Sequence, residues 1–263
     1  MRIAIIGSAP SSIRLAPYGD PDWQIYGCSP GAYHVVSRVT AWFELHRWEP
    51  PTVGRPDKQV PWFSPEYVQW MAKQPLVWVS DPAALSDLPS GKLLAWEELC
   101  ERYGHYWFTS SIAWMMATAI DAIRADRTTR EGETQDAIGF WGVDMSATEE
   151  YSQQRMGCQF FAQLAWSMGI QVIVPPESDL LVPAPLYGVS ETWHRSIKLR
   201  ARRSELEQRL AANLAAKERT LHEELFLRGA LDDMTYQQQT WIHEGEAKGP
   251  DLAALLGIHG DSS

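Results

Sequence analysis

Residues 1–20 read MRIAIIGSAPSSIRLAPYGD, and an apolar run at Ile3–Ile6 stops abruptly at Gly7. A short apolar run bounded by turn residues is typical of a strand that is buried on both faces, as strands of parallel sheets are. The residues from Gly7 to Ser11 that follow are small or carry hydroxyl groups. We therefore expect an inner strand of a parallel sheet that ends in a tight, polar turn.

Five further runs of the same kind follow, each ending in a turn with polar residues. They are Gln24–Cys28, Thr40–Glu44, Leu76–Val79, Ala137–Trp141 and Ile170–Val174. Apolar residues recur at helical spacing in Thr109–Ile123, which begins with hydroxyl residues, and in Tyr151–Gly169, which ends on glycine. Alternating strands and helices predict an α/β fold, namely a Rossmann-like three-layer sandwich around a mostly parallel sheet.

The sequence after residue 187 follows a different pattern. Leucines recur in mixed steps of seven and four at Leu199, Leu206, Leu210, Leu214, Leu221 and Leu225. This spacing predicts a long helix with a seam for another helix, and Gly229 offers a turn into a second one. We expect two domains, a Rossmann-like domain of residues 1–187 and a C-terminal α-helical hairpin or coiled-coil extension of residues 188–263. Pairing of this extension predicts a homo-oligomer.

Two segments have open interpretations. The start of the predicted long helix is basic, with Arg195, Lys198, Arg200, Arg202 and Arg203, and is either a solvated helix face or a surface for a polyanion. Residues 48–67, WEPPTVGRPDKQVPWFSPEY, contain five prolines and are too long for a plain connection. They form either a lid or an ordered surface loop that holds Trp48 and Trp62.

The composition indicates a globular protein with a sizeable core, since 45% of its 263 residues are apolar and 21% are charged. A formal net charge of −10 argues against a surface built around nucleic-acid phosphates. Three scattered cysteines, Cys28, Cys100 and Cys158, suggest neither a disulfide framework nor a zinc site. The chain starts without a charged leader or a long apolar segment, so we expect a cytoplasmic protein that binds no membrane.

The turn after the first strand is the first candidate for a binding site. In an open parallel sheet, ligands bind at the carboxyl ends of the strands. A glycine there allows close approach of a ligand, and free N–H groups at the start of a following helix can hold an anion. The candidate residues of this phosphate-binding turn are Gly7, Ser8, Ala9, Pro10 and Ser11. The turn lacks the lysine and spacing of a P-loop, and a tight turn that binds nothing is the alternative.

Polar residues at the other predicted strand ends are expected to gather on the same edge. They are Ser29, Glu44, His46, Thr109, Ser110, Gly142 and Asp144. Together they supply hydroxyl groups, two acids and one imidazole, which is enough to hold a nucleotide. Each also has a structural interpretation: Thr109 as a helix cap, Asp144 as a turn cap and His46 as a partly buried histidine.

Five motifs resemble, in order and spacing, the bacterial sialyltransferases that act on lipooligosaccharide and the related pterin-diphosphokinase-like domains. They are IIGSAPSS, IYGCSPGAY, FTSSIAWMMATAI, GFWGVDM and GIQVIVPPESDLL. The resemblance covers residues 1–187 and does not extend to the predicted hairpin. The stretch GVDMSATEEY is also similar to one in uncharacterised tailed-phage proteins.

The resemblance implies a nucleotide-sugar site. It places the Gly-X-Gly-Pro-Ser turn of the family on Gly7–Ser11, a nucleotide contact on Ser29, the Thr-Ser helix start on Thr109–Ser110 and the Gly-Ile-Asp strand end on Gly142–Asp144. Ser8 and Ala9 replace the Asn and the second Gly of the family motif.

The family's general base is a histidine that would fall near Ser152, and this sequence has no histidine between His105 and His194. The residues available nearby are Glu149 and Glu150, which could deprotonate an acceptor, and Arg155, which could stabilise a leaving phosphate. An acidic first helical turn is the alternative interpretation of the two glutamates.

Three classes of function remain open. A nucleotide-sugar-dependent glycosyltransferase would use Glu149, Glu150 or His46 as base, with a glycan or a hydroxylated base of phage DNA as acceptor. A diphosphotransferase of the pterin kinase type would need ATP and a divalent ion held by carboxylates such as Glu44 and Asp144. A non-enzymatic assembly module would use the helical extension as its working surface. We favour the first, with a nucleotide sugar as donor and the metal requirement left open.

Overall fold

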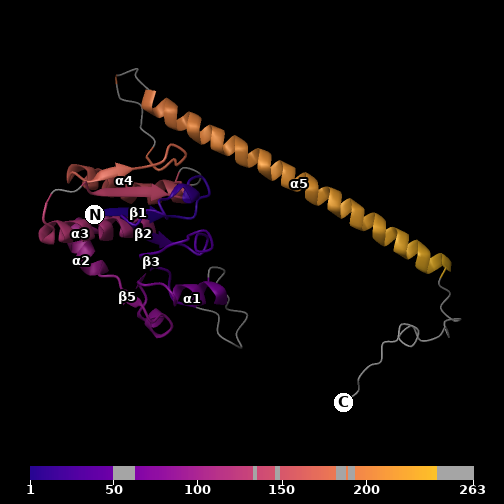
Figure 1. The fold of residues 1–263 in the computed structure, drawn as a ribbon, viewed down its shortest axis with the longest axis horizontal. Helices are drawn as coiled ribbons and strands as arrows, with labels where there is room; N and C mark the ends of the chain where they lie inside the picture. The colour runs from indigo at the N-terminus through magenta and orange to yellow at the C-terminus, as the bar shows by residue number, and fades with distance from the viewer. Residues whose placement is uncertain (50–62, 133–134, 146–148, 182–187, 189–192, 242–263) are drawn as a thin grey trace, which may run out of the picture. The chain divides into compact units, whose positions relative to one another are not determined.

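The computed structural model describes residues 1–49, 63–132, 135–145, 149–181, 188 and 193–241 (Figure 1). The side chains of residues 149–153, 193–195 and 240–241 are outside the description. The chain divides into two compact units, Met1–Glu205 and Leu206–Ser263. The first unit contains the sheet and all of the candidate site residues.

A parallel sheet of seven strands forms the centre of the first unit. The strands are β1 (Arg2–Ile6), β2 (Trp23–Cys28), β3 (Ala41–Glu44), β4 (Val77–Val79), β5 (Gly91–Leu93), β6 (Ala137–Trp141) and β7 (Gln171–Ile173). Their order in space is β5-β4-β3-β2-β1-β6-β7. Every neighbouring pair is parallel, and β1 lies between β2 and β6. The predicted α/β fold with a parallel sheet is confirmed.

Strand β1 is central because its side chains are apolar on both faces. Successive side chains of a strand point to opposite faces, so Ile3 and Ile5 enter one hydrophobic core while Ala4 and Ile6 enter the other. All four are fully buried. A strand of this kind is stable only where helices or loops cover both of its faces.

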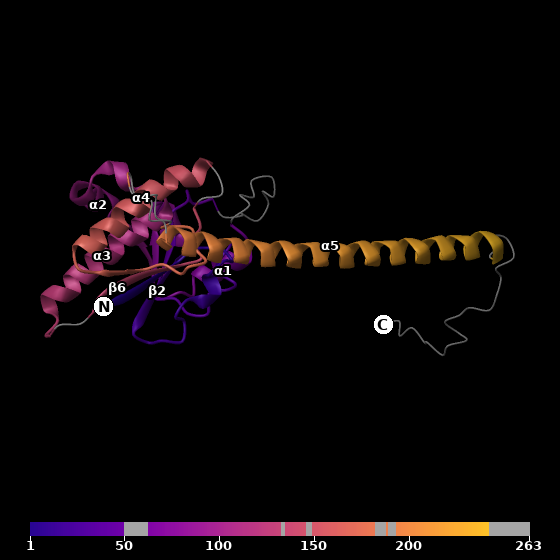
Figure 2. The same ribbon diagram turned by 90° about the horizontal axis from the view of Figure 1, so that it is seen from above.

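Helices cover the face that Ile3 and Ile5 enter. They are α2 (Trp96–Tyr103), α3 (Ser111–Thr129) and α4 (Glu149–Ser167), which Figure 2 shows together over one side of the sheet. The other face is covered by α1 (Pro65–Met71) and by the short 3-10 helices η1 (Ile13–Leu15) and η3 (Pro82–Ser86). These layers confirm the predicted three-layer sandwich.

The two predicted helices have the expected ends. Ser110 caps α3 by accepting a hydrogen bond from the backbone N–H of Ala113 at 3.2 Å. Gly169 follows α4 with a φ of 72°, a left-handed conformation that glycine adopts without strain. The third 3-10 helix of the described chain, η4 (His105–Trp107), directly precedes α3.

Several elements differ from the prediction. Strand β5 and helices α1 and α2 were not expected, and the turn after β1 is followed by the three-residue helix η1 instead of an α-helix. No α-helix dipole therefore supports an anion at this turn. The lid predicted for residues 48–67 lies mostly outside the described residues, but the Trp48 indole is buried and donates to Asp87 at 2.8 Å.

The predicted turn at Gly229 is wrong. Helix α5 runs without interruption from Trp193 to Trp241, so the C-terminal region is one long helix and not a hairpin over these residues. A glycine costs a helix about 1 kcal/mol relative to alanine, which weakens a long helix without ending it. In the second unit the predicted seam residues Leu206 to Leu225 are exposed. Pairing of this helix with another remains a prediction.

No helix among the described residues is both long enough and apolar enough to cross a membrane.

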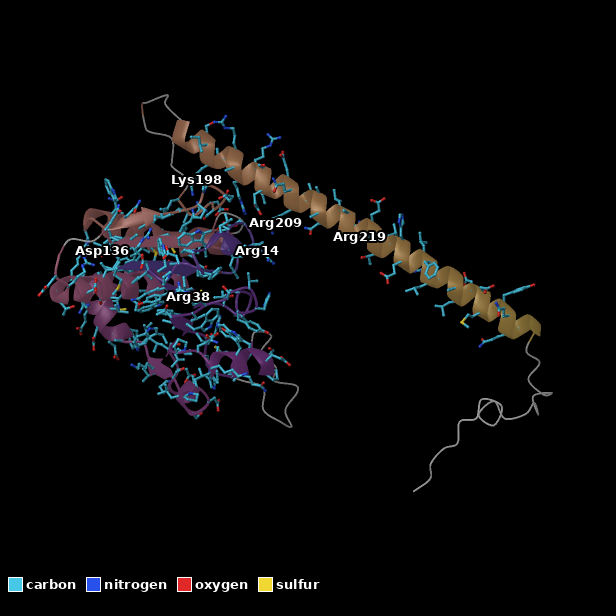
Figure 3. All side chains as sticks on the ribbon, viewed as in Figure 1. Arg14, Arg38, Asp136, Lys198, Arg209 and Arg219 are labelled. Carbon is cyan, nitrogen blue, oxygen red and sulfur yellow. The ribbon has the colours of Figure 1, made fainter. Side chains whose placement is uncertain are left out.

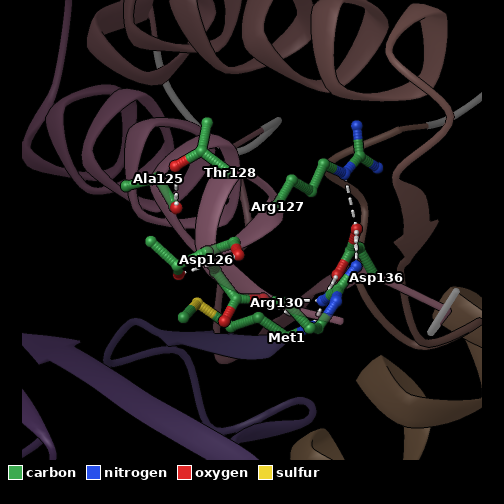
Figure 4. Close-up of polar contacts among 8 residues, drawn as sticks. Met1, Ala125, Asp126, Arg127, Thr128, Arg130 and Asp136 are labelled. Atoms are coloured by element: carbon green, nitrogen blue, oxygen red, sulfur yellow. Dashed lines mark hydrogen bonds and ion pairs between the residues drawn. The ribbon is translucent and has the colours of Figure 1, made fainter. Parts of the chain in front are cut away.

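The amino-terminal edge of the sheet contains a buried carboxylate, Asp136, whose side chain is 1% exposed (Figures 3 and 4). It accepts hydrogen bonds from the Met1 α-amino group at 2.5 Å, from Arg127 Nε at 2.6 Å and from Arg130 Nη1 at 2.9 Å. Burial by itself would raise the pKa of Asp136. The hydrogen bonds from Arg130, the α-amino group and Arg127 outweigh it and hold this pKa below its usual range.

Replacing this carboxylate with an amide tests its contribution to stability. We expect Asp136→Asn to lower the free energy of unfolding by about 3 kcal/mol at pH 7, because cations remain beside a buried neutral group. A depressed native pKa stabilises the fold above the ordinary Asp pKa of about 4 and loses this effect as the pH falls through the native value. The difference in free energy of unfolding between wild type and Asp136→Asn, measured by urea denaturation, should therefore become smaller below about pH 4.

The matched control is Asp121→Asn, which removes a more exposed carboxylate paired with Arg102. A surface pair contributes at most about 1 kcal/mol. Equal decreases in the free energy of unfolding of Asp136→Asn and Asp121→Asn would contradict the stabilising role of Asp136.

Candidate functional site

The order of the strands defines where a ligand is expected. Strands β2 to β5 lie in chain order on one side of β1, and β6 and β7 lie on its other side. The strand order reverses between β1 and β6, and in open α/β sheets ligands bind outside the carboxyl ends of the strands at this point. The residues that follow β1 and β6 are Gly7–Ser12 and Gly142–Asp144.

The ends of β1 and β6 are in direct backbone contact at Gly7 and Gly142. The Gly7 N–H donates to the Trp141 carbonyl at 2.9 Å, and the Ala9 N–H donates to the Gly142 carbonyl at 2.8 Å. A Cβ on Gly142 would lie 2.6 Å from the Gly7 oxygen, and Gly142 has a φ of 67°. Both positions therefore require glycine. The amides of Gly7 and Ala9 hold the turn in place, so a phosphate would have to bind elsewhere on it.

Two neighbouring serines, Ser11 and Ser12, have buried hydroxyl oxygens, and Ser12 ties the turn to the end of β6. The Ser12 hydroxyl is buried and accepts from the Gly142 N–H at 2.9 Å. The Ser11 hydroxyl oxygen is buried without a partner within normal hydrogen-bond distance among the described residues, but it is near enough to Asp144 to lower the pKa of that carboxyl. Burial is the larger effect at Asp144 and raises its pKa overall.

The turn also meets the loop after β2. A Cβ on Gly31 would lie 3.2 Å from the Ser8 Cβ and 3.6 Å from the Ser29 Oγ, which places two exposed or half-exposed serines side by side. Ser29 has a φ of 80°, the one left-handed non-glycine residue of the described chain, and its hydroxyl accepts from the Gly31 N–H at 3.2 Å. Pro10 is exposed on the same turn. The predicted convergence of the β1 and β2 loops is thus present.

Arg202, near the start of α5 (Trp193–Trp241), forms ion pairs with a residue that follows β6. Arg202 Nη1 lies 2.9 Å from the Asp144 carboxylate and 2.6 Å from that of Glu205, and its Nη2 lies 3.6 Å from Asp179. The Asp179 carboxylate also accepts from the Met145 N–H at 2.6 Å. Asp144 is therefore an ion-paired residue that follows β6 at the point where the strand order reverses.

A lysine one turn earlier reinforces this contact. Lys198, labelled in Figure 3, donates to the Ser178 carbonyl at 2.8 Å, and the Ser178 hydroxyl donates to the Val143 carbonyl at 2.6 Å. Burial lowers the pKa of Lys198 to about 8. Of the basic residues predicted to form a solvated or polyanion-binding face, Lys198 and Arg202 instead bind groups of the first unit.

Thr109 and Ser110 face helix α4. The Thr109 hydroxyl donates to the Gln154 carbonyl at 2.8 Å and accepts from the Gly157 N–H at 3.2 Å. The Ser110 hydroxyl lies 3.5 Å from the Cys158 sulfur in addition to its capping bond. Both hydroxyls hold α3 against α4, and neither is shown beside Ser11 or Ser29.

A histidine–glutamate pair lies at the end of β3. Glu44, the last residue of the strand, is 1% exposed, and its Oε1 accepts from His46 Nδ1 at 2.5 Å and from the His46 backbone N–H at 3.1 Å. Its Oε2 accepts from the Tyr67 hydroxyl at 2.7 Å, and the Tyr67 oxygen accepts from Trp42 Nε1 at 2.8 Å. The His46 side chain is 46% exposed, so this buried network reaches the surface at an imidazole.

The electrostatics of this network follow from one buried carboxylate. The hydrogen bond to Glu44 raises the pKa of His46, and burial only partly opposes it. Burial, with Glu44 as a further cause, raises the pKa of Tyr67 well above its usual value and that of Cys28 to about 12. Tyr67 and Cys28 thus stay neutral near pH 7, and Glu44 favours a proton on His46.

The remaining predicted catalytic residues divide into two groups. Arg155 donates from Nε and Nη2 to the Met145 carbonyl at 2.9 and 2.6 Å, so it holds the segment after β6. Glu149 and Glu150 are the first residues of α4, and their side chains lie outside the described residues.

The diphosphotransferase hypothesis would place Glu44 and Asp144 on one metal ion, but each carboxylate already has partners of its own. Glu44 accepts from His46 and Tyr67, and Asp144 is paired with Arg202. Over the described residues, no three His, Cys, Asp or Glu side chains are grouped as metal ligands.

Three residues of this region were not singled out from the sequence as site residues: Tyr67, Ser12 and Arg202. Tyr67 lies in the segment predicted as a proline-rich loop, although Ser64 followed by Pro65 is a helix-start signal. Arg202 belonged to the basic run, and its three carboxylate neighbours are distant from one another in sequence.

No protein-family model and no curated protein sequence matches this chain. Among solved structures, the sialyltransferase CST-II in complex with a trisaccharide acceptor and CMP is similar over 68% of this chain and 83% of its own, at 13% identity and a TM-score of 0.42. CstII from Campylobacter jejuni with the substrate analogue CMP-3FNeuAc covers the same shares, at 14% identity and a TM-score of 0.38. Both of these proteins are sialyltransferases. Similarity of this degree decides nothing about activity.

The glycine contact between β1 and β6 can be tested by substitution. We expect Gly142→Ala to destabilise the fold by about 1–3 kcal/mol more than Gly169→Ala, because overpacking is added to the strain of a positive φ. Both glycines have a positive φ, but a Cβ at Gly169 would meet nothing within 4 Å. Urea denaturation measures the free energy of unfolding of both variants. Equal decreases would show that the close contact between Gly7 and Gly142 does not contribute to stability.

The Glu44–His46 pair predicts a pH-dependent contribution to stability. Because the native pKa of His46 is raised, the contribution is complete below the unfolded value of about 6.5 and is lost as the pH rises through the native value. The difference in unfolding free energy between wild type and His46→Gln should therefore be larger at pH 6 than at pH 9. His105→Gln, at an exposed position in η4, is the control that removes a histidine and leaves the Glu44–His46 contact in place. A larger difference at pH 9 for His46→Gln would contradict the pairing.

Proposed function

We propose that this chain is a nucleotide-sugar-dependent glycosyltransferase, in which His46 is the general base and Glu44 holds its imidazole. The observation that carries the proposal is the 2.5 Å contact between the buried Glu44 carboxylate and His46 Nδ1 at the carboxyl edge of the sheet. A carboxylate bound to one ring nitrogen leaves the other nitrogen as the basic atom, which is the usual arrangement of a catalytic histidine.

The donor would bind at the reversal point of the sheet. The turn Gly7–Ser11 and the serines Ser8 and Ser29 supply small residues and hydroxyl groups there, and the left-handed Ser29 is a strained residue of the kind found at ligand sites. The ends of β1 and β3 are two strand spacings, or about 10 Å, apart. That span suits a donor whose phosphates lie at β1 and whose sugar lies at β3.

The chemistry required of these residues is limited. His46 would accept the proton of an acceptor hydroxyl as its oxygen attacks the anomeric carbon, and the nucleotide would leave with the electrons of the broken bond. The leaving group needs hydrogen-bond donors, for which the hydroxyls of Ser8 and Ser29 are the candidates. The acceptor remains a glycan or another hydroxylated compound.

A thermal-shift and hydrolysis screen tests this function. The panel contains CMP-, UDP-, GDP- and dTDP-sugars together with CMP and CMP-3FNeuAc, each with and without Mg²⁺ or Mn²⁺. We expect one nucleotide class to raise the Tm, and its sugar to be hydrolysed or transferred. His46→Asn should lower the turnover at least about 100-fold, with the donor Kd unchanged, because it removes a base and not a binding group.

His105→Asn is the control and should keep full turnover. A protein that neither binds nor hydrolyses any member of the panel would overturn the proposal. An active protein that His46→Asn leaves unchanged would remove His46 from the mechanism.

A further inference from the structure

Two elements of the first unit and the residues that follow one of them contribute to one buried hydrogen-bonded network. Strand β3 supplies Trp42 and Glu44, helix α1 supplies Tyr67, and His46 follows the strand. Trp42 and Tyr67 are fully buried and Glu44 is 1% exposed. The four side chains are joined in sequence by contacts of 2.8, 2.7 and 2.5 Å.

The direction of each hydrogen bond in this chain is fixed by chemistry. An indole N–H can only donate, so the Tyr67 oxygen must accept from Trp42. The single proton of the Tyr67 hydroxyl is then directed to Glu44 Oε2. An ionised carboxylate only accepts, so His46 Nδ1 must donate to Oε1. This hydrogen-bonded network therefore specifies the neutral tautomer of His46 that carries its proton on Nδ1.

Tyr67 is itself held rigidly. Its backbone N–H donates to the Ser64 cap at 3.2 Å, and its ring lies 5.0 Å from that of Tyr33 and 6.3 Å from those of Trp42 and Trp70. A side chain locked by packing can fix the rotation of the carboxylate that it contacts.

Two groups that Glu44 influences stay neutral near pH 7. The Tyr67 hydroxyl contacts Glu44 directly, and Glu44 contributes to the raised pKa of Cys28 on β2. Among the described residues, Arg47 pairs with Glu49 at 3.2 Å, and Asp81 accepts from the Trp48 N–H at 2.9 Å. Glu44 is thus a charged group that the imidazole contacts directly.

We infer that Tyr67 is a positioning residue for His46: its hydroxyl orients the Glu44 carboxylate, which in turn keeps the imidazole proton on Nδ1 and makes Nε2 the basic atom. The catalytic meaning of this role rests on the proposed function, whereas the effect on the tautomer does not. Without the Tyr67 hydroxyl, Glu44 Oε2 loses its donor and the carboxylate is free to rotate away from Nδ1.

The test is a measurement of the His46 tautomer by NMR. The full chain is labelled with ¹⁵N-histidine, and His46→Gln assigns the His46 signals among those of the seven histidines. At a pH above the pKa of His46, wild type should show mainly the Nδ1–H form. In Tyr67→Phe the ratio of Nδ1–H to Nε2–H should fall at least about threefold, because free imidazole favours Nε2–H.

Tyr33→Phe is the matched control, since it removes a hydroxyl from the adjoining ring without touching Glu44, and it should leave the ratio unchanged. If Tyr67→Phe does not fold, Trp42→Phe replaces it, and the same shift is expected at smaller size because the Tyr67 hydroxyl loses its fixed orientation. An unchanged ratio in the folded variant, or a wild-type His46 that is mainly Nε2–H, would overturn the inference.

The two proposals can fail separately. If Tyr67→Phe shifts the tautomer but no nucleotide sugar is bound or hydrolysed, Tyr67 still positions His46 and the proposed function fails. If the enzyme is active and Tyr67→Phe changes neither the tautomer nor the pH profile of kcat, the function stands and the role of Tyr67 fails.

Discussion

The backbone contact between Gly7 and Gly142 is the constraint on which the carboxyl edge of the sheet depends. It joins the two strands between which the strand order reverses, and it leaves no room for a Cβ on either residue. Beside it, the Ala9 N–H donates to the Gly142 carbonyl and the Gly142 N–H donates to the Ser12 hydroxyl. The turn that the sequence presents as a phosphate-binding site therefore first connects β1 to β6, and its exposed serine, Ser8, is the hydroxyl that it offers to a ligand.

Two buried carboxylates show how differently the same group is used in this fold. Asp136 is surrounded by cations, which hold its charge in place at the amino edge. Glu44 has neutral donors and one imidazole as its partners. A buried charge balanced by several fixed cations contributes stability, whereas one that faces a titratable ring controls the protonation of that ring. For this reason we propose the general base at the end of β3, where Glu44 contacts His46. Asp144, which follows β6, is paired with Arg202.

Much of the fold could be predicted because strands and turns are local features. Runs such as Ile3–Ile6 and Ala137–Trp141 are buried on both faces, and their composition shows it. Strand β5 could not be found this way, because Gly91–Leu93 is an edge strand of three residues with little apolar character. The hairpin at Gly229 failed for another reason: a glycine permits a turn but does not impose one.

The candidate site could be predicted only in part. The sequence shows that three polar residues follow predicted strands, namely Ser8, Ser29 and Asp144. In the structure the turn after β1 contacts those after β2 and β6. Which hydroxyl faces solvent and which faces a helix is decided by packing, as the contacts of Thr109 with α4 show. The network from Trp42 to His46 joins residues of β3 with one on α1, and no spacing rule connects them.

Strand β6 is secured at both of its ends. Asp136 binds arginines and an amino group just before the strand begins, and Gly142 is locked against Gly7 just after it ends. A shift of the strand along its own axis would have to break the ionic cluster and force a backbone collision at the same time. Axial slippage of this strand is therefore opposed at both of its ends.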